Sequence, residues 1–136
     1  MADMLLVKDV MTKGVRVTGP DSIVREVVAT MNRFNIGSII VVQDNKPVGV
    51  ISERDVLRRV VEPCLSPETI TAKQIMTCPV ITICESASVA EVVKIMAEKR
   101  VRKIPVMKKE RLVGIITYTD ILSKVLSTIS ILGELI

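Results

Sequence analysis

Two patterns of apolar residues follow one another along this chain in a fixed order: short continuous runs, and segments in which apolar residues recur at helical spacing. Between short apolar runs, apolar residues recur at helical spacing, as in Val24, Val27 and Val28. We expect Asp21 or Ser22 to cap that helix. The apolar runs are rich in Val and Ile, as buried strands are, and lie at Val15–Thr18, Ile39–Val42, Val48–Ile51, Val80–Ile83, Ile104–Met107 and Val113–Ile116.

The second half of the chain repeats this order of elements. Ser88 and Glu91 have the spacing of a capping box ahead of the next amphipathic helix. A further helix is expected to begin near Asp55 in the first half and near Asp120 in the second. Each half therefore predicts the order β-α-β-β-α, and the chain as a whole an α/β fold made of two tandem repeats.

Self-comparison supports the repeat directly. A shift that carries Lys8 onto Lys73 superimposes KDVMT on KQIMT and, further on, VGVISERDVL on VGIITYTDIL, without a gap. Chance seldom aligns apolar positions, a glycine and an aspartate together, so the chain holds two copies of one unit. Half of the chain is too short to bury a good core alone, so we expect the copies to pack on each other. The expected divisions are a first repeat at 1–62, a linker at 63–72, a second repeat at 73–126 and a helical tail at 127–136.

The end of the third predicted strand in each copy carries the pattern Gly-apolar-apolar-hydroxyl-x-x-Asp. The hydroxyl and the carboxylate are Ser52 and Asp55 in the first copy, and Thr117 and Asp120 in the second. One turn apart at the start of a helix, such a pair can bind the vicinal hydroxyls of a sugar, because an ionised aspartate accepts several hydrogen bonds. The same spacing is that of a capping box, so the pair can also serve only to cap the helix. The two interpretations are compatible.

Together, the tandem repeat, the Met-Thr pairs at 11–12 and 76–77 and the two Gly-h-h-[Ser/Thr]-x-x-Asp endings resemble a pair of cystathionine β-synthase (CBS) domains, the unit called a Bateman module. The resemblance covers about residues 4–126. It implies two repeats related by a pseudo-two-fold axis, which form a regulatory module that binds AMP, ADP, ATP or S-adenosylmethionine in clefts between them. It also assigns roles to matching positions: Asp55 and Asp120 as ribose-binding aspartates, Ser52 and Thr117 as their hydroxyls, and Thr12 and Thr77 at the adenine end. Which repeat supplies the adenine wall to which aspartate stays open.

The two copies differ where the resemblance places a phosphate. Arg102 and Lys103 precede a strand of the second copy, whereas Gly-Ser stands at the matching positions 37–38 of the first. Arginine can form two parallel hydrogen bonds to a phosphate and lysine supplies a point charge, so the second copy is expected to accept a phosphate better. Arg54 and Lys124 are also placed in the sequence to reach an anion. An exposed strand end would explain Arg102 and Lys103 without any ligand.

Composition narrows the classes of function. The chain has no histidine, which excludes a Ser-His-Asp triad, a Cys-His pair and histidine-ligated metal sites. Phe34 and Tyr118 are its only aromatic residues and its net charge is +4, so nucleic-acid binding through the basic stretch 99–111 has little support. We therefore expect no enzyme, no catalytic residue and no metal. No cofactor is required, and an adenine nucleotide or S-adenosylmethionine is the expected regulatory ligand.

The cysteines and the first residues of the chain indicate the cellular compartment in which we expect the protein. Cys64, Cys78 and Cys84 are an odd number without CxxC spacing, and we interpret them as small apolar residues in a reducing cytosol. The first residues lack a basic region followed by a long apolar core, and no apolar run approaches the ~20 residues that span a bilayer. A cytoplasmic protein with no membrane partner is expected, whose output passes to an unknown downstream protein.

The end of the chain predicts self-association. Apolar residues there continue at helical spacing over 122–136, and a stripe of that size on a monomer marks an association site. We expect a homodimer through helices, as the resemblance also implies, although the tail could instead fold back over its own sheet. A ligand-free dimerisation scaffold is the alternative to the ligand-binding module. The stripe consists of Leu122, Val125, Leu126, Ile129 and Leu132, widened by Ile131, Leu135 and Ile136.

Overall fold

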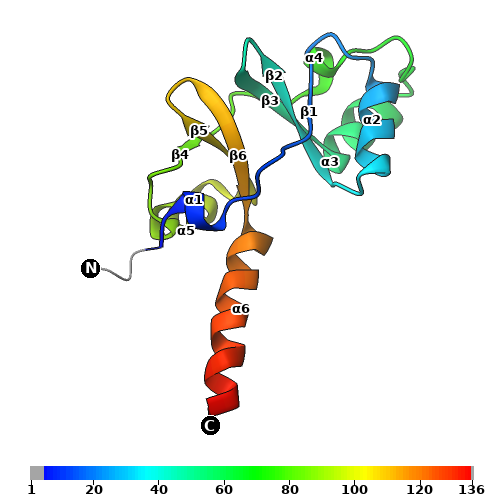
Figure 1. Cartoon of the computed structure of the whole chain (residues 1–136). Helices are drawn as coiled ribbons and strands as arrows, with labels where there is room; N and C mark the ends of the chain where they lie inside the picture. The colour runs from blue at the N-terminus through cyan, green and yellow to red at the C-terminus, as the bar shows by residue number, and fades with distance from the viewer. Residues whose placement is uncertain (1–4, 136) are drawn as a thin grey trace. The chain divides into compact units, whose positions relative to one another are not determined.

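A computed structural model describes the backbone of residues 5–135 and the side chains of residues 5–129. The chain forms two compact units, which exchange segments: one is Arg16–Val80, and the other combines the N-terminal segment to Val15 with the chain from Ile81 onward. We call them the central unit and the terminal unit. Each holds its own three-stranded sheet (Figure 1).

The central unit follows the predicted order of elements. Its elements are β1 (Val17–Thr18), α2 (Val24–Arg33), β2 (Ser38–Gln43), β3 (Lys46–Ser52), α3 (Glu53–Val56), the π-helix η1 (Leu57–Val61) and α4 (Ala72–Ile75). β1 pairs parallel with β2, and β2 pairs antiparallel with β3. Asp44 and Asn45 make the tight turn between β2 and β3 in the left-handed region, with φ of 53° and 66°, a conformation that Asn and Asp tolerate better than most residues.

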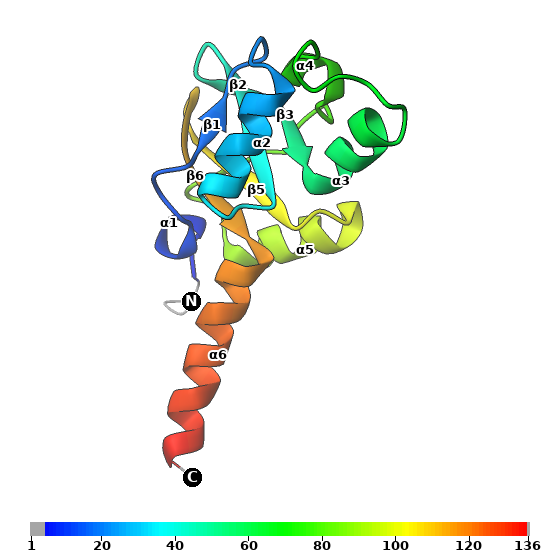
Figure 2. The ribbon, with the colours of Figure 1, turned by 90° about the vertical axis from the view of Figure 1, so that its right-hand side faces the viewer.

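The terminal unit repeats the same sheet. Its elements are α1 (Val7–Val10), β4 (Ile83–Cys84), α5 (Val89–Lys99), β5 (Lys103–Lys108), β6 (Arg111–Thr117) and α6 (Tyr118–Leu135). β4 pairs parallel with β5, and β5 antiparallel with β6. Residues 127–135 of the predicted tail are the continuation of α6, an unbroken helix that extends beyond the sheet of its unit (Figures 1 and 2), and residue 136 lies outside the described residues. It does not fold back over that sheet.

Each unit has its own apolar core, made from the positions that the periodic patterns predicted. The inward faces of α2 and α5 supply Val24, Val27 and Met31 in one core and Val92 and Met96 in the other. The order of buried and exposed positions in the strands matches between the units. β2 and β5 have one burial pattern, and β3 and β6 share another. The buried strand residues are Ile39, Val41 and Ile51 in the central core and Ile104, Val106 and Ile116 in the terminal core.

The exchange of segments places each Met-Thr pair on the sheet of the other sequence repeat. Thr12 pairs with Ile115 of β6 through two backbone hydrogen bonds of 2.8 and 3.0 Å. Thr77 pairs in the same way with Val50 of β3, at 2.8 and 3.0 Å. The compact units therefore do not coincide with the sequence repeats.

The repeated glycine makes this close approach possible. A Cβ on Gly114 would lie 2.9 Å from the carbonyl oxygen of Thr12 and 2.7 Å from the sulfur of Met11. A Cβ on Gly49 would collide with the side chain of Met76. Glycine at these two positions thus lets the Met-Thr segments lie flat on the third strand.

Several local expectations were wrong. Ile23, rather than Asp21 or Ser22, is the N-cap of α2, because the Ser22 hydroxyl instead accepts a hydrogen bond of 3.3 Å from the Gly19 N–H. Ser88 does cap α5, accepting from the Glu91 N–H at 3.1 Å. The outer strands β1 and β4 are shorter than the apolar runs that predicted them.

Two further features differ from the sequence-based expectation. The three cysteines, Cys64, Cys78 and Cys84, are free and exposed rather than packed as small apolar residues. The segment 63–72 is more than a connection, because Ile70 and Ala72 are buried in the core of the central unit.

Candidate functional site

In the central unit, the Gly-h-h-Ser-x-x-Asp motif lies where β3 passes into α3. Ser52 is the N-cap of α3, and its hydroxyl accepts a hydrogen bond of 3.2 Å from the Asp55 N–H. The Asp55 carboxylate accepts one of 2.9 Å from the Ser52 N–H, which completes a capping box. The other oxygen of Asp55 accepts a hydrogen bond of 3.0 Å from the Thr77 hydroxyl. Three predicted site residues therefore meet in one unit.

The terminal unit reproduces this arrangement with its own residues. Thr117 and Asp120 form the same reciprocal pair of backbone hydrogen bonds, at 3.0 and 3.1 Å. The Thr12 hydroxyl donates to Asp120 Oδ1 at 3.2 Å. Within the terminal unit the Thr12 hydroxyl therefore contacts Asp120, as the Thr77 hydroxyl contacts Asp55 within the central unit.

Capping does not exhaust the hydrogen-bonding capacity of these carboxylates. An ionised carboxylate has about four lone-pair sites, and each aspartate uses one oxygen for the backbone N–H and the other for the threonine hydroxyl. Asp55 and Asp120 are half-buried, and Thr12 and Thr77 are exposed beside them. Each set can accept further hydrogen bonds from a diol while it caps its helix.

Arg59 is a residue of this region that the sequence reasoning missed. Its guanidinium donates hydrogen bonds of 2.8 and 3.0 Å to the carbonyls of Ile75 and Met76, and it lies 4.0 Å from Asp55 Oδ1. It therefore fixes the backbone just before Thr77. The available signal was its position four residues after Asp55, which is ion-pair spacing on a helix.

The cations predicted to receive a phosphate differ in their surroundings. Lys103 is half-buried; burial lowers the pKa of its ammonium, and the nearby carboxylate of Asp120 partly opposes that shift. The guanidinium of Arg102 lies over the ring of Tyr118, 5.3 Å from its centre. Both lie in the terminal unit, beside Thr117 and Asp120. Arg54 is exposed on α3, and within the described residues its side chain forms no hydrogen bond or ion pair with Asp55.

The described part of the chain has neither a cluster of metal ligands nor a helix that could cross a membrane. Among the side chains of residues 5–129, no three acidic or cysteine residues cluster as metal ligands would. None of the helices within residues 5–135 combines the length and hydropathy of a bilayer-spanning segment. A hydrogen bond from Ser86 lowers the pKa of the exposed Cys84 thiol, which by itself makes no site.

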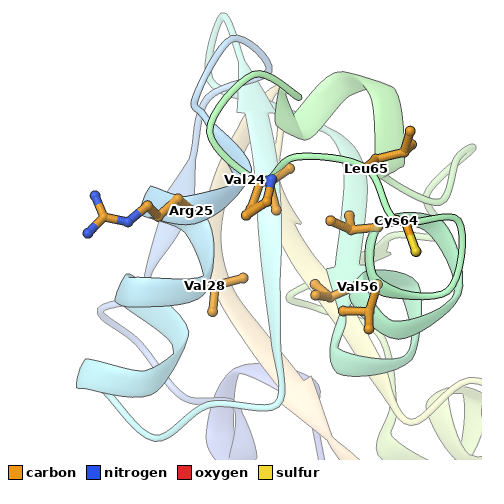
Figure 3. A pocket seen from close by; sticks show the side chains of 9 residues that line it. Val24, Arg25, Val28, Val56, Cys64 and Leu65 are labelled. Carbon is orange, nitrogen blue, oxygen red and sulfur yellow. The ribbon is translucent and has the colours of Figure 1, made fainter.

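The central unit also carries an apolar groove of about 390 Å³. It lies between α2 on one side and α3, η1 and the following loop on the other, with the Arg25 side chain pointing away from it (Figure 3). Val61, which lines the groove, and Leu57 of the same helix are each 59% exposed. The lining residues are Val24, Arg25, Val28, Val56, Val60, Val61, Cys64, Leu65 and Pro67.

Comparison with known proteins agrees with the repeat. A family model described as CBS domain matches residues 7–62 and again residues 72–127. A protein of Methanopyrus kandleri with no described function is 38% identical over 109 residues, which make up 78% of this chain and 56% of that protein. Hypoxic response protein 1 of Mycobacterium tuberculosis is 30% identical over 119 residues, or 87% of this chain and 83% of that one.

Solved structures share the fold. A crystal structure of Hypoxic Response Protein I with two coordinated zinc ions has a TM-score of 0.79 and 28% identity, covering 87% of this chain and 97% of that one. A hexameric CBS-CP12 protein from bloom-forming cyanobacteria has a TM-score of 0.79 and 28% identity, covering 89% of this chain and 72% of that one.

Proposed function

Since the chain belongs to the CBS-domain family and carries both repeats, we propose that it is a regulatory module that binds an adenosine-containing ligand and passes the resulting change to a partner protein. Paired CBS domains are generally regulatory modules that bind adenosine ligands. The proposed ligands are AMP, ADP, ATP or S-adenosylmethionine. The proposed binding groups are the hydroxyl, threonine and aspartate sets: Ser52, Thr77 and Asp55 in the central unit, and Thr117, Thr12 and Asp120 in the terminal unit.

The observation that carries the proposal is the duplication of one polar set. A capping box needs two residues, yet in both units a third, threonine side chain from a distant part of the chain reaches the aspartate. A ribose presents two adjacent hydroxyls, and a carboxylate with free lone pairs accepts from both. Thr12 and Thr77 can turn their hydroxyls from the aspartate to the ligand without disturbing the backbone pairs that hold them.

Thermal unfolding with added ligand tests this proposal. At a ligand concentration of ~100 Kd, binding stabilises the native state by about 2.7 kcal/mol, which is on the order of 5–10 °C in Tm for a chain of this size. The compounds to compare are AMP, ADP, ATP and S-adenosylmethionine, with CMP as the control for nonspecific anion effects. No shift with any adenosine compound at millimolar concentration would reject the proposal.

The Asp55→Asn and Asp120→Asn variants locate the sites. Asparagine keeps the size of the side chain but loses the charge and one acceptor oxygen, so we expect each variant to lose about 1.5–3 kcal/mol of binding at its own unit. The weakened cap should cost about 0.5–2 kcal/mol of stability. A variant that melts earlier and binds as before would leave its aspartate with the capping role alone.

Self-association without a ligand is a second candidate, favoured by the exposed apolar helix surfaces. The groove of the central unit and the outer face of α6 both present aliphatic side chains to solvent. Such a scaffold would keep its mass and its Tm unchanged in every nucleotide tested.

A further inference from the structure

The two polar sets have different electrostatic surroundings at matching positions of the sheet. In the terminal unit Lys103 is paired in register with Thr117, whereas in the central unit the residue paired with Ser52 is Ser38. The ammonium of Lys103 interacts electrostatically with the carboxylate of Asp120. A neutral serine takes that place beside Asp55.

The preceding pair of positions differs more strongly. In the terminal unit, the Tyr118 N–H donates to the Arg102 carbonyl at 2.9 Å, and the Arg102 guanidinium lies over the Tyr118 ring. In the central unit, the Glu53 N–H donates in the same way to the Gly37 carbonyl at 3.1 Å. The backbone hydrogen bond is the same in the two units, but the side chains differ. Arg102 and Tyr118 of the terminal unit correspond to Gly37 and Glu53 of the central unit.

The side chain of Glu53 lies beside Gly37. Oε1 of Glu53 lies 3.8 Å from where a Cβ on Gly37 would stand. A carboxylate in the central unit therefore faces the position from which Arg102 extends in the terminal unit. Arg59 lies 4.0 Å from Asp55, and its guanidinium is already bonded to the carbonyls of Ile75 and Met76.

The balance of charge around the two aspartates is therefore opposite. In the terminal unit Arg102 and Lys103 give two positive charges against the one negative charge of Asp120. In the central unit Glu53 and Asp55 give two negative charges against the one positive charge of Arg59. Charges that lie close together near a protein surface interact strongly enough to select among ligands. The terminal set is therefore expected to attract a phosphate, and the central set to repel one.

We propose that the two units divide adenosine compounds by charge: the terminal unit binds a phosphorylated adenosine, and the central unit binds an adenosine compound whose 5′ carbon carries no phosphate. This inference rests on the proposed function and adds the ligand class of each site. Adenosine and S-adenosylmethionine both have the chemistry that fits the central unit, the second with a positive sulfonium at the 5′ carbon.

Calorimetric titration of the full chain tests this division. AMP should bind with one equivalent per chain in its tight phase, and adenosine or S-adenosylmethionine should still bind when AMP is saturating. Two equivalents of AMP with equal affinity would overturn the division and leave the proposed function standing. Failure of every adenosine compound to bind would overturn both.

Matched variants assign the sites. In Asp120→Asn, where the central unit remains, AMP should bind about tenfold more weakly than adenosine, and adding Glu53→Gln should remove most of that difference. In Asp55→Asn, AMP should bind about tenfold more tightly than adenosine, and adding Lys103→Met should reduce this preference. Arg54→Ala is the control in the central unit, since a loss of AMP binding there would show that Arg54 attracts phosphate and would overturn the proposal. The stoichiometry on the wild-type chain decides the question if an aspartate variant fails to fold.

Discussion

Asp120 accepts a hydrogen bond from the hydroxyl of Thr12, a residue 108 positions earlier in the chain. The bond is possible because the N-terminal segment is paired with β6 rather than with the sheet of its own repeat. Asp55 and Thr77 repeat the relationship in the central unit. The polar sets thus depend on the exchange of segments, and each can be perturbed from two distant places in the sequence.

Thr12→Val should weaken the terminal unit by about 0.5–1 kcal/mol in unfolding free energy, because it removes one net hydrogen bond at an exposed site. Thr12→Ser is the control, since it keeps the hydroxyl, and should remain close to the wild type. Thr77→Val should cost less, because Asp55 keeps Arg59 within 4.0 Å. Urea denaturation of the three variants makes the comparison, and equal stability of Thr12→Val and Thr12→Ser would contradict it.

Arg59→Met should destabilise the chain by about 1.5–3 kcal/mol, since two carbonyls lose a charged donor. Arg58→Met is the matched control, because Arg58 is the preceding exposed arginine of the same helix, and we expect a change within about 0.5 kcal/mol. Thermal unfolding and nucleotide titration would both be measured. If Arg59→Met behaved like Arg58→Met, the contacts to Ile75 and Met76 would contribute nothing to stability.

Much of this fold follows from local patterns. The inner strands and the long helices α2, α5 and α6 could be predicted, because burial in strands and at helical spacing depends on neighbouring residues. The short helices α1 and α4 were not predicted. The cap of α2 was assigned wrongly, because Ser22 satisfies the N–H of Gly19 instead. Which backbone N–H a serine hydroxyl accepts from depends on the geometry of the turn, and residue types alone do not specify that geometry.

The exchange of segments could not be predicted for a different reason. KDVMT and KQIMT are so similar that either segment fits either third strand, and periodicity identifies buried faces without identifying their partners. The spacing of Arg59 from Asp55 indicated only an ion pair. Its hydrogen bonds to Ile75 and Met76 could not be predicted, since the acceptors are backbone carbonyls, which are present at every residue. The hydroxyl and aspartate residues of the two polar sets were predictable from the repeated motif. Thr12 and Thr77 were implied only by the family resemblance, and their hydrogen bonds to the aspartates needed the structure.

Lys103→Met should raise the stability of the chain at neutral pH by up to about 0.5 kcal/mol. Burial lowers the pKa of Lys103 in the native state below its ordinary value of 10.5, and Asp120 offsets only part of that effect. Between the native pKa and 10.5, the unfolded chain binds more protons at this residue, so the stability of the wild type rises with pH there. The advantage of the variant should therefore shrink as pH rises toward 10.5. Urea denaturation of both proteins from pH 7 to pH 10 checks the trend, which a constant difference would contradict.

The outer face of α6 supports the prediction of a homodimer. Leu126 and Ile129 are 62% and 56% exposed, and Leu122 and Val125 are also exposed on the same helix. The predicted continuation of the stripe at Ile131, Leu132, Leu135 and Ile136 lies outside the residues whose side chains are described. A closed dimer with two-fold symmetry, the commonest form of assembly, would bury such a surface against its copy.

Light scattering at micromolar concentration should give about twice the chain mass of 15.0 kDa. Leu126→Glu with Ile129→Glu should reduce it to the mass of a single chain, because two buried carboxylates oppose association across a symmetric contact. Ser123→Glu with Ser127→Glu, at exposed polar positions of α6, is the control and should stay dimeric. A dimer that survives the first pair but dissociates with Leu57→Glu and Val61→Glu would place the contact at the groove of the central unit. A wild-type species of 15.0 kDa would refute the dimer altogether.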